Sequence, residues 1–213
     1  AAPDTTAGPS CAAASTGTWL VTRFEFVGAG EGGRTEGFNV DGLVSTGSDP
    51  GGCRKADVVS PDGTEGVDNQ FATLLPALAT IGVDLDSLIN QRVLEGTLLL
   101  VVRMDGTLAD CDALSFQRGA GPVLFDADGT LTSHQTLGLE AGATVSTTTA
   151  CDFDAACAGT ASGDSLVLEF LFISSEIRLE FIAWQSAFQL NEAGALEGLL
   201  GGAVTLDSVN EIV

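Results

Sequence analysis

Tight turns of one kind recur along this chain and limit what it can fold into. The dipeptide Asp-Gly occurs four times, at 41–42, 62–63, 105–106 and 128–129. It is a strong turn signal because both residues tolerate positive φ. Three of the four lie between apolar, strand-like runs. Short strands joined by such turns are typical of an antiparallel β-sandwich or a barrel-like domain, so we expect a mainly β fold.

The apolar runs between these turns locate the expected strands. Residues 18–27 alternate apolar and polar positions, with Trp19, Val21 and Phe24 among the apolar ones, and residues 97–104 are apolar on both faces. Residues 165–174 and 176–185 predict a hairpin. Shorter strand candidates are 113–117, 122–125, 130–133 and 143–149.

A small helical insert, at about 67–95, interrupts the strand pattern. Residues 67–79 carry apolar positions at helical spacing, with Pro76 forcing a break or a new first turn. Asp84 or Asp86 caps a second helix, which Gly96 ends. Near the end of the chain, Asp207 is expected to cap a short closing helix. We expect a tail at 1–16 and a single β-rich domain at 17–213.

The charge balance narrows the list of partners. Asp and Glu number 29 against eight Lys and Arg, giving a formal net charge of −21. Such a charge repels phosphates and anionic lipid, which excludes nucleic acid and anionic membrane surfaces as partners. The longest aliphatic run, 98–102, is far short of the ~20 residues that span a bilayer, so no membrane insertion is expected. The acidity fits simple solubility, a saline habitat or cation binding.

The five cysteines, at 11, 53, 111, 151 and 157, favour disulfides in a secreted protein, because no pair has CxxC spacing and there is a single histidine. Cys151 with Cys157 would close a short acidic loop. Cys53 with Cys111 would leave Cys11 odd, and the alternative joins Cys11 to Cys53.

The first residues indicate export and assembly. The start of the chain looks like the mature end left after a signal peptide is cleaved. Residues 1–16 are Ala, Thr, Ser, Gly and Pro with one Asp and one Cys, a composition that cannot bury itself. We expect this tail to lie against a sheet edge, its own or that of another copy.

Oxygen-bearing side chains crowd one turn and predict a calcium site, since calcium takes six to eight oxygen ligands. The alternative is that Asp62-Gly63 only turns the chain while Asp68 and Asn69 cap a helix. Two other acidic turns, Asp126 with Asp128 and Asp152 with Asp154, are weaker candidates for the same ion. The candidate ligands of the main site are Asp57, Asp62, Glu65, Asp68 and Asn69.

A sequence pattern also resembles a known group. The segments Gly37-Phe-Asn-Val-Asp-Gly42, then Cys53, then Ser60-Pro-Asp-Gly-Thr-Glu-Gly-Val-Asp-Asn-Gln-Phe-Ala72 and Leu74-Leu-Pro76 resemble a set of uncharacterised exported bacterial proteins, many of them lipoproteins. The resemblance covers about half the chain and implies export, with no activity attached. Gly8-Pro-Ser-Cys11 departs from a lipidation box, which argues against an anchor at Cys11.

Signals for catalysis are few. His134 is the one base available to a Ser or Cys nucleophile, and it lies in a polar, turn-like segment. If the 166–184 hairpin turns at 174–175, Glu169 lies opposite Glu180, with carboxylates ~5 Å apart as in retaining glycosidases. The simpler interpretation is a salt-bridged polar face with Arg178. Residues 28–33 match G-x-G-x-x-G, but no helix is expected after them, so we expect a hairpin loop.

We therefore expect the protein to act by binding other molecules and not by catalysis. The sequence favours a secreted or cell-surface structural subunit that self-associates through its N-terminal tail, stabilised by disulfides and by calcium. The alternative is a calcium-dependent carbohydrate- or surface-binding module, which would need an exposed Trp19 or Trp184 for stacking. A two-carboxylate glycosidase built on Glu169 and Glu180 is the third hypothesis.

Overall fold

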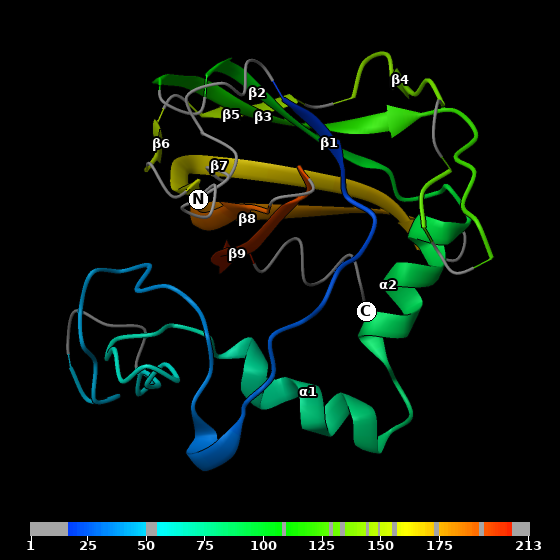
Figure 1. The fold of residues 1–213 in the computed structure, drawn as a ribbon. Helices are drawn as coiled ribbons and strands as arrows, with labels where there is room; N and C mark the ends of the chain where they lie inside the picture. Colours follow the sequence, from blue (N-terminus) through cyan, green and yellow to red (C-terminus); the bar gives the residue numbers. More distant parts are fainter. Residues whose placement is uncertain are drawn as a thin grey trace, which may run out of the picture.

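The fold consists of two antiparallel sheets with two helices and a long loop region beside them (Figure 1). It is seen in a computed structural model. The described residues are 17–49, 55–107, 110–127, 130–132, 135–143, 145–148, 150–154, 157–172, 175–191 and 194–205. The tail at 1–16, Cys53, Asp128, His134 and the predicted closing helix at Asp207 lie outside them.

The first sheet is built around the hairpin of β2 and β3. β1 pairs with the outer side of β2, while β4 and β5 both pair with β3, and every pairing is antiparallel. The predicted turn at Asp105-Gly106 is instead a β-bulge inside β2, where the register shifts just before the hairpin. The strands are β1 (Thr18–Leu20), β2 (Leu100–Thr107), β3 (Asp110–Ala120), β4 (Gly138–Leu139) and β5 (Val145–Thr148).

The second sheet has the order β6-β7-β8-β9, again antiparallel throughout. The long hairpin of β7 and β8 confirms the one predicted from the sequence and extends it at its open end, while its last pair before the turn is Phe172 with Ser175. β9 was not expected from the sequence, because its glycines lower the strand signal. The strands are β6 (Ala150–Phe153), β7 (Ala158–Phe172), β8 (Ser175–Leu190) and β9 (Leu196–Val204).

The main core lies between the two sheets. Met104, Leu114 and Phe116 from the first sheet and Leu166 and Trp184 from the second are all buried in one cluster. The rings of Phe116 and Trp184 meet edge to face, with centroids 5.3 Å apart. The fold is therefore mainly β with a small helical insert, and its two sheets face each other as in a sandwich.

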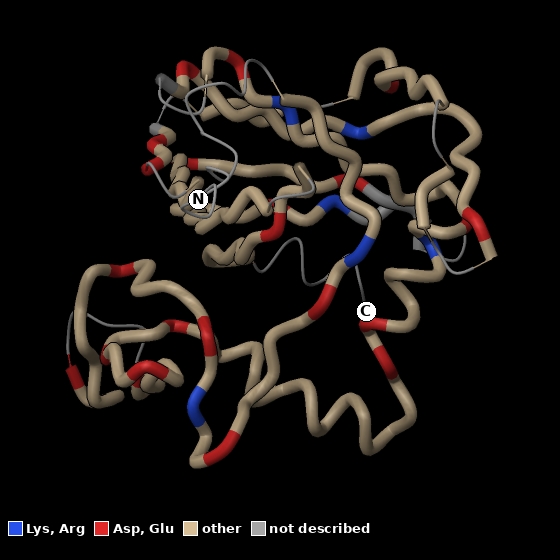
Figure 2. Tube along the Cα trace, in the orientation of Figure 1, with Lys and Arg blue, Asp and Glu red and all other residues tan. Residues whose placement is uncertain are grey.

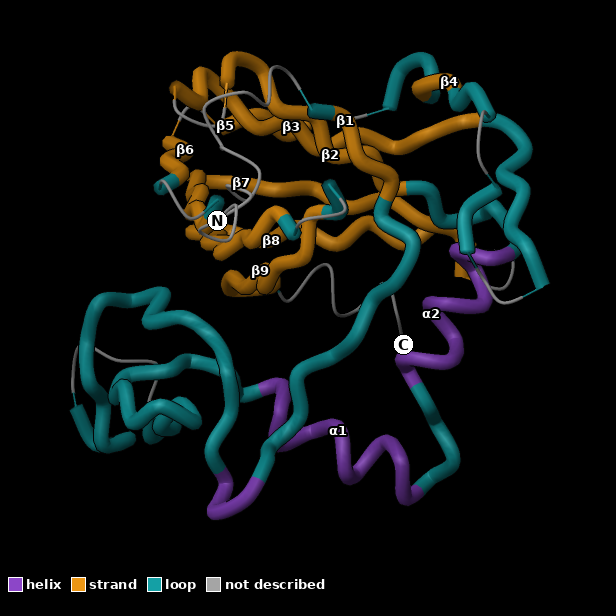
Figure 3. The backbone as a smooth tube through the Cα atoms, in the orientation of Figure 1, coloured by secondary structure: helices purple, strands orange, loops and turns teal. Residues whose placement is uncertain are grey.

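The two helices form where the sequence places the insert, although the first begins later. α1 (Phe71–Thr80) holds Pro76 within it, and α2 (Leu85–Leu94) follows after a turn (Figure 3). Asp84 caps α2 by accepting a hydrogen bond from Ser87 N. Gly96 adopts a φ of 71°, the left-handed conformation that ends helices. Both predicted boundaries of the second helix are confirmed.

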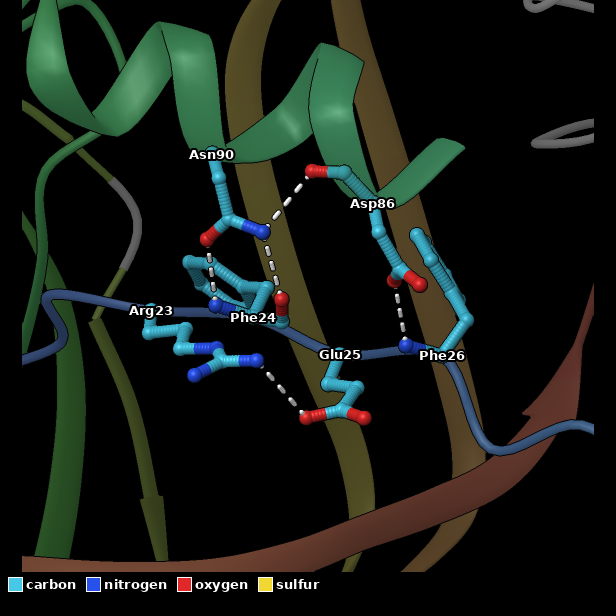
Figure 4. A network of polar contacts seen from close by, with 6 residues as sticks. All are labelled: Arg23, Phe24, Glu25, Phe26, Asp86 and Asn90. Carbon is cyan, nitrogen blue, oxygen red and sulfur yellow. Dashed lines mark hydrogen bonds and ion pairs between the residues drawn. The ribbon is translucent and has the colours of Figure 1, made fainter. Parts of the chain in front are cut away.

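Side chains of α2 hold the extended segment that leaves β1 (Figure 4). Asn90 accepts a hydrogen bond from Phe24 N at 2.8 Å and donates one to Phe24 O at 2.6 Å. Asp86 accepts one from Phe26 N at 2.7 Å. The predicted strand over 18–27 is thus only three residues long, and the α2 side chains take the place of a neighbouring strand.

One disulfide within the described residues joins the two sheets. Cys111 in β3 is bonded to Cys151 in β6, with Cα atoms 5.8 Å apart. Cys157 is also disulfide-bonded. The expected pairs Cys151–Cys157 and Cys53–Cys111 are therefore wrong, because Cys111 and Cys151 already bond to each other. Spacing along the chain did not reveal that two different sheets bring them together.

Candidate functional site

The predicted calcium ligands lie in the loop region at 28–70, which we call the lobe (Figures 2 and 3). Its described parts are 28–49 and 55–70. Two antiparallel bridges, Thr46↔Ala56 and Val58↔Val67, hold the lobe together. Acidic positions outnumber basic ones along it (Figure 2).

The Val58–Val67 bridge brings Asp57 and Asp68 opposite one another. Val58 and Val67 exchange two backbone hydrogen bonds, of 2.9 and 3.1 Å, so the next pair outward is Asp57 with Asp68. The Asp68 carboxylate accepts hydrogen bonds from Val40 N at 2.6 Å and Asp41 N at 3.2 Å. Two predicted ligands, Asp57 and Asp68, are thus brought together, while the carboxylate of the neighbouring Asp41 accepts from Leu43 N.

Electrostatics at this pair are unfavourable for two negative charges. Burial raises the pKa of Asp68, and the neighbouring charges of Asp41 and Asp57 raise it further, against the lowering effect of the Val40 and Asp41 amides. Asp57 accepts from Ser45 N through Oδ2. Two buried oxygens, Asp57 Oδ1 and Asn39 Oδ1, have no hydrogen-bond partner within the described residues. A buried acceptor without a donor is costly, and a cation would relieve both features.

The other three predicted ligands of the main site do not join this pair. Asp62 accepts hydrogen bonds from Ser60 Oγ and Thr64 N inside its turn, which lowers its pKa. Glu65 is exposed. Asn69 accepts from Ala72 N at 3.1 Å and donates to Glu36 O at 2.9 Å, so it caps α1 and ties the lobe to it.

The remaining acidic candidates are separate from this pair. Asp154 Oδ1 accepts from Ala158 N at 3.0 Å, which closes the loop before β7. Asp152 is exposed on β6 opposite Thr160. Asp126 accepts from Thr132 Oγ1 at 3.1 Å. Across the described ranges, no group of three or more His, Cys, Asp or Glu side chains is arranged to hold a metal ion.

The hairpin register separates the two glutamates considered for catalysis. Glu169 lies opposite Arg178, and Glu180 lies opposite Val167, two residues away from the predicted pairing. The Arg178 guanidinium contacts Glu169 at 3.7 Å and Glu180 at 3.3 Å. The predicted direct opposition is wrong because the centre of the β7–β8 hairpin lies one residue earlier than assumed, which shifts the pairing by two residues. The face is salt-bridged instead.

The tryptophans are not arranged for stacking on a sugar. Trp184 is 1% exposed and packs on Phe116 in the core. Trp19 is partly exposed and donates its Nε1 hydrogen to Gly194 O at 3.1 Å, next to β9. A cavity of about 500 Å³ lies between Phe38 and Val40 of the lobe and strands β7 and β8.

An exposed apolar surface on α1 is the feature that the sequence reasoning missed. Residues 71–83 carry no charge in a chain with 37 charged residues. One side of α1 packs inward, with Ala72 buried and the Phe71 ring 5.4 Å from that of Phe26. The other side leaves Leu74 48% and Ile81 74% exposed. The absence of charged residues from a whole surface helix was the available signal.

Comparison of the chain with protein-family models, with curated proteins and with solved structures finds no match. In the part of the chain that is described, no single helix is long and apolar enough to cross a membrane. α1 and α2 together reach that length and composition, but they meet at a 90° bend.

Proposed function

We propose that this protein is an extracellular structural subunit that acts by binding further copies of itself. The observation that carries the proposal is the outer surface of α1, where Leu74 is exposed together with Ile81 at the end of the helix. A surface helix normally turns polar residues outward, and exposed apolar patches mark interaction sites. In an acidic protein, an uncharged patch is also where two copies approach with least repulsion.

The location rests on the disulfide and on the sequence pattern. The Cys111–Cys151 bond is consistent with an oxidising compartment, where such bonds persist. The resemblance to exported bacterial proteins points to the same compartment. The tail at 1–16 stays a predicted contact element, outside the described residues.

Sedimentation of the purified protein over a wide concentration range tests the proposal. The weight-average mass is expected to rise with concentration, and Leu74→Gln and Ile81→Gln to weaken association. Half-burying such a side chain contributes roughly 1 kcal/mol, about a fivefold change in Kd. Leu94→Gln is the control, because Leu94 is 50% exposed on α2 instead. A monomer at every concentration would contradict the proposal, and flotation of the protein with zwitterionic vesicles would identify α1 as a lipid contact.

Calcium remains part of the proposal as a stabiliser of the lobe. The oxygens that support it are the opposed carboxylates of Asp57 and Asp68 and the Oδ1 atoms of Asp57 and Asn39, which have no partner among the described residues. Calcium is expected to raise the melting temperature of the native protein over an EDTA control, and Asp57→Asn to abolish the increase. Asp152→Asn, an exposed acid outside the lobe, should keep it. An equal response of all three proteins would remove calcium from the proposal.

A further inference from the structure

β9 is an edge strand whose outer side has no partner among the described residues. Its inner side pairs with β8 from Leu190↔Leu196 to Phe181↔Val204. The sheet order β6-β7-β8-β9 ends there (Figure 1). No hydrogen bond between described residues reaches the outer edge of β9. Among the described residues, the outer side of β9 therefore presents an open row of backbone donors and acceptors.

The hydrogen bonds at both ends of β9 show which residues face outward. Asn191 N donates to Ala195 O, and Thr205 N donates to Glu180 O. In an antiparallel ladder, pairs that exchange backbone hydrogen bonds alternate with pairs that do not. Because Ala195 and Thr205 both bond to residues of the β8 side, the odd-numbered residues of β9 bond to β8. The residues with outward N–H and C=O groups are Leu196, Gly198, Leu200, Gly202 and Val204.

The side chains that usually protect an edge strand are missing from β9, and the register shift in its ladder places the extra residue in β8, between Ile182 and Gln185. Natural edges carry Lys, Pro or bulges that prevent pairing with another chain. Residues 196–204 contain no Lys and no Pro, and Glu197 is their single charge. Val204 is 39% exposed at the end of the strand. An edge of this kind is suited to a strand from a second molecule.

We propose that β9 pairs with β9 of a second copy, antiparallel and related by a two-fold axis at Leu200. This inference rests on the proposed self-association and specifies one interface for it. The register follows from the backbone: outward-facing residues meet outward-facing residues, with Leu200 opposite itself and Gly198 opposite Gly202 of the second copy.

The side chains fit this register in size and charge. Leu196 lies opposite Val204 of the second copy, and Leu199 opposite Gly201. Leu196 and Leu200 already pack against the core, so the apolar layer continues across the interface. Glu197 lies opposite Ala203 of the second copy. The two Glu197 side chains are about 20 Å apart, beyond the ~8 Å Debye length at physiological salt.

Charge substitutions at Ala203 test the register. Ala203 is exposed, so either sign is tolerated within one copy. Ala203→Lys is expected to tighten the dimer roughly 2- to 30-fold, because two Lys–Glu197 pairs form, and Ala203→Glu to weaken it by a similar factor. The double variant Glu197→Lys with Ala203→Glu is expected to restore association. Ala141→Lys and Ala141→Glu, in an exposed turn, control for net charge.

The outcomes separate this inference from the proposed function. Sedimentation equilibrium showing opposite shifts at residue 203, with restoration in the double variant, supports the β9 pairing. Association that ignores the sign at residue 203, or a double variant that stays weakened, overturns the pairing and leaves self-association standing. A wild-type protein that is monomeric at all concentrations overturns both.

Discussion

The side chain of Asn90 replaces a strand for the segment that follows β1, and its removal tests that role. Asn90 bonds both backbone groups of Phe24, at 2.8 and 2.6 Å, from a partly buried position. Each such bond contributes about 1 kcal/mol, so Asn90→Ala should lose about 2 kcal/mol of unfolding free energy. Alanine has a higher helix propensity than asparagine, which offsets roughly 0.5 kcal/mol of that loss.

The measurement is urea unfolding followed by circular dichroism, with amide exchange as a local readout. We expect Asn90→Ala to lower the urea midpoint and to speed exchange at the Phe24 amide. Asn90→Asp should be at least as harmful at neutral pH, because a carboxylate offers no donor to Phe24 O.

The matched control lies on the same segment. Arg23 and Glu25 form an ion pair at 3.3 Å with both side chains exposed. Such pairs contribute little, so Arg23→Ala and Glu25→Ala should each stay within about 0.5 kcal/mol of the native protein. Equal midpoints for Asn90→Ala and Arg23→Ala would refute the strand-replacement role.

Three further predictions follow from the structure. The raised pKa of Asp68 means that folding takes up a proton, so the free energy of unfolding should fall as pH rises from the ordinary carboxyl range through the folded pKa. Asp68→Asn should flatten that part of a stability–pH curve measured without calcium. The Ser87 hydrogen bonds lower the pKa of Asp84 in the folded protein. The native protein should therefore be more stable than Asp84→Ala above the pKa of the unfolded state, and this difference should vanish as pH falls through the pKa of the folded state. Asp84→Ser should keep the cap at all pH values. Replacing Cys111 and Cys151 together by Ala should lower the free energy of unfolding by about 4 kcal/mol, the value of the chain-entropy model for a separation of 40 residues. Urea unfolding measures this loss, and a loss near zero would show that the bond does not stabilise the fold.

Local signals in the sequence predicted what short-range physics determines. Asp84 and Gly96 bound α2 because capping depends on a few neighbouring residues. The β7–β8 hairpin follows from alternation alone. Its register does not, since a shift of two residues keeps every side chain on the same face, and Glu169 therefore pairs with Arg178 and not with Glu180.

Long-range pairing set the remaining features. Residues 21–27 alternate like a strand, but nothing in that pattern shows that α2 supplies the partners. β9 pairs with β8 despite three glycines, so tertiary context overrides its weak propensity. For the candidate site, the Asp62-Gly63 turn brings Asp57 near Asp68, whereas the approach of Asp41 to Asp68 joins residues 27 positions apart in the chain.

The Cys111–Cys151 bond alters how the molecule would respond to tension. A force applied along the chain would pass directly from β3 to β6 and bypass the residues between them. Those residues could otherwise extend by about 140 Å, at ~3.5 Å each. A stretched subunit would therefore extend by about 140 Å less with this bond intact than with it reduced, and a reductant would release that length.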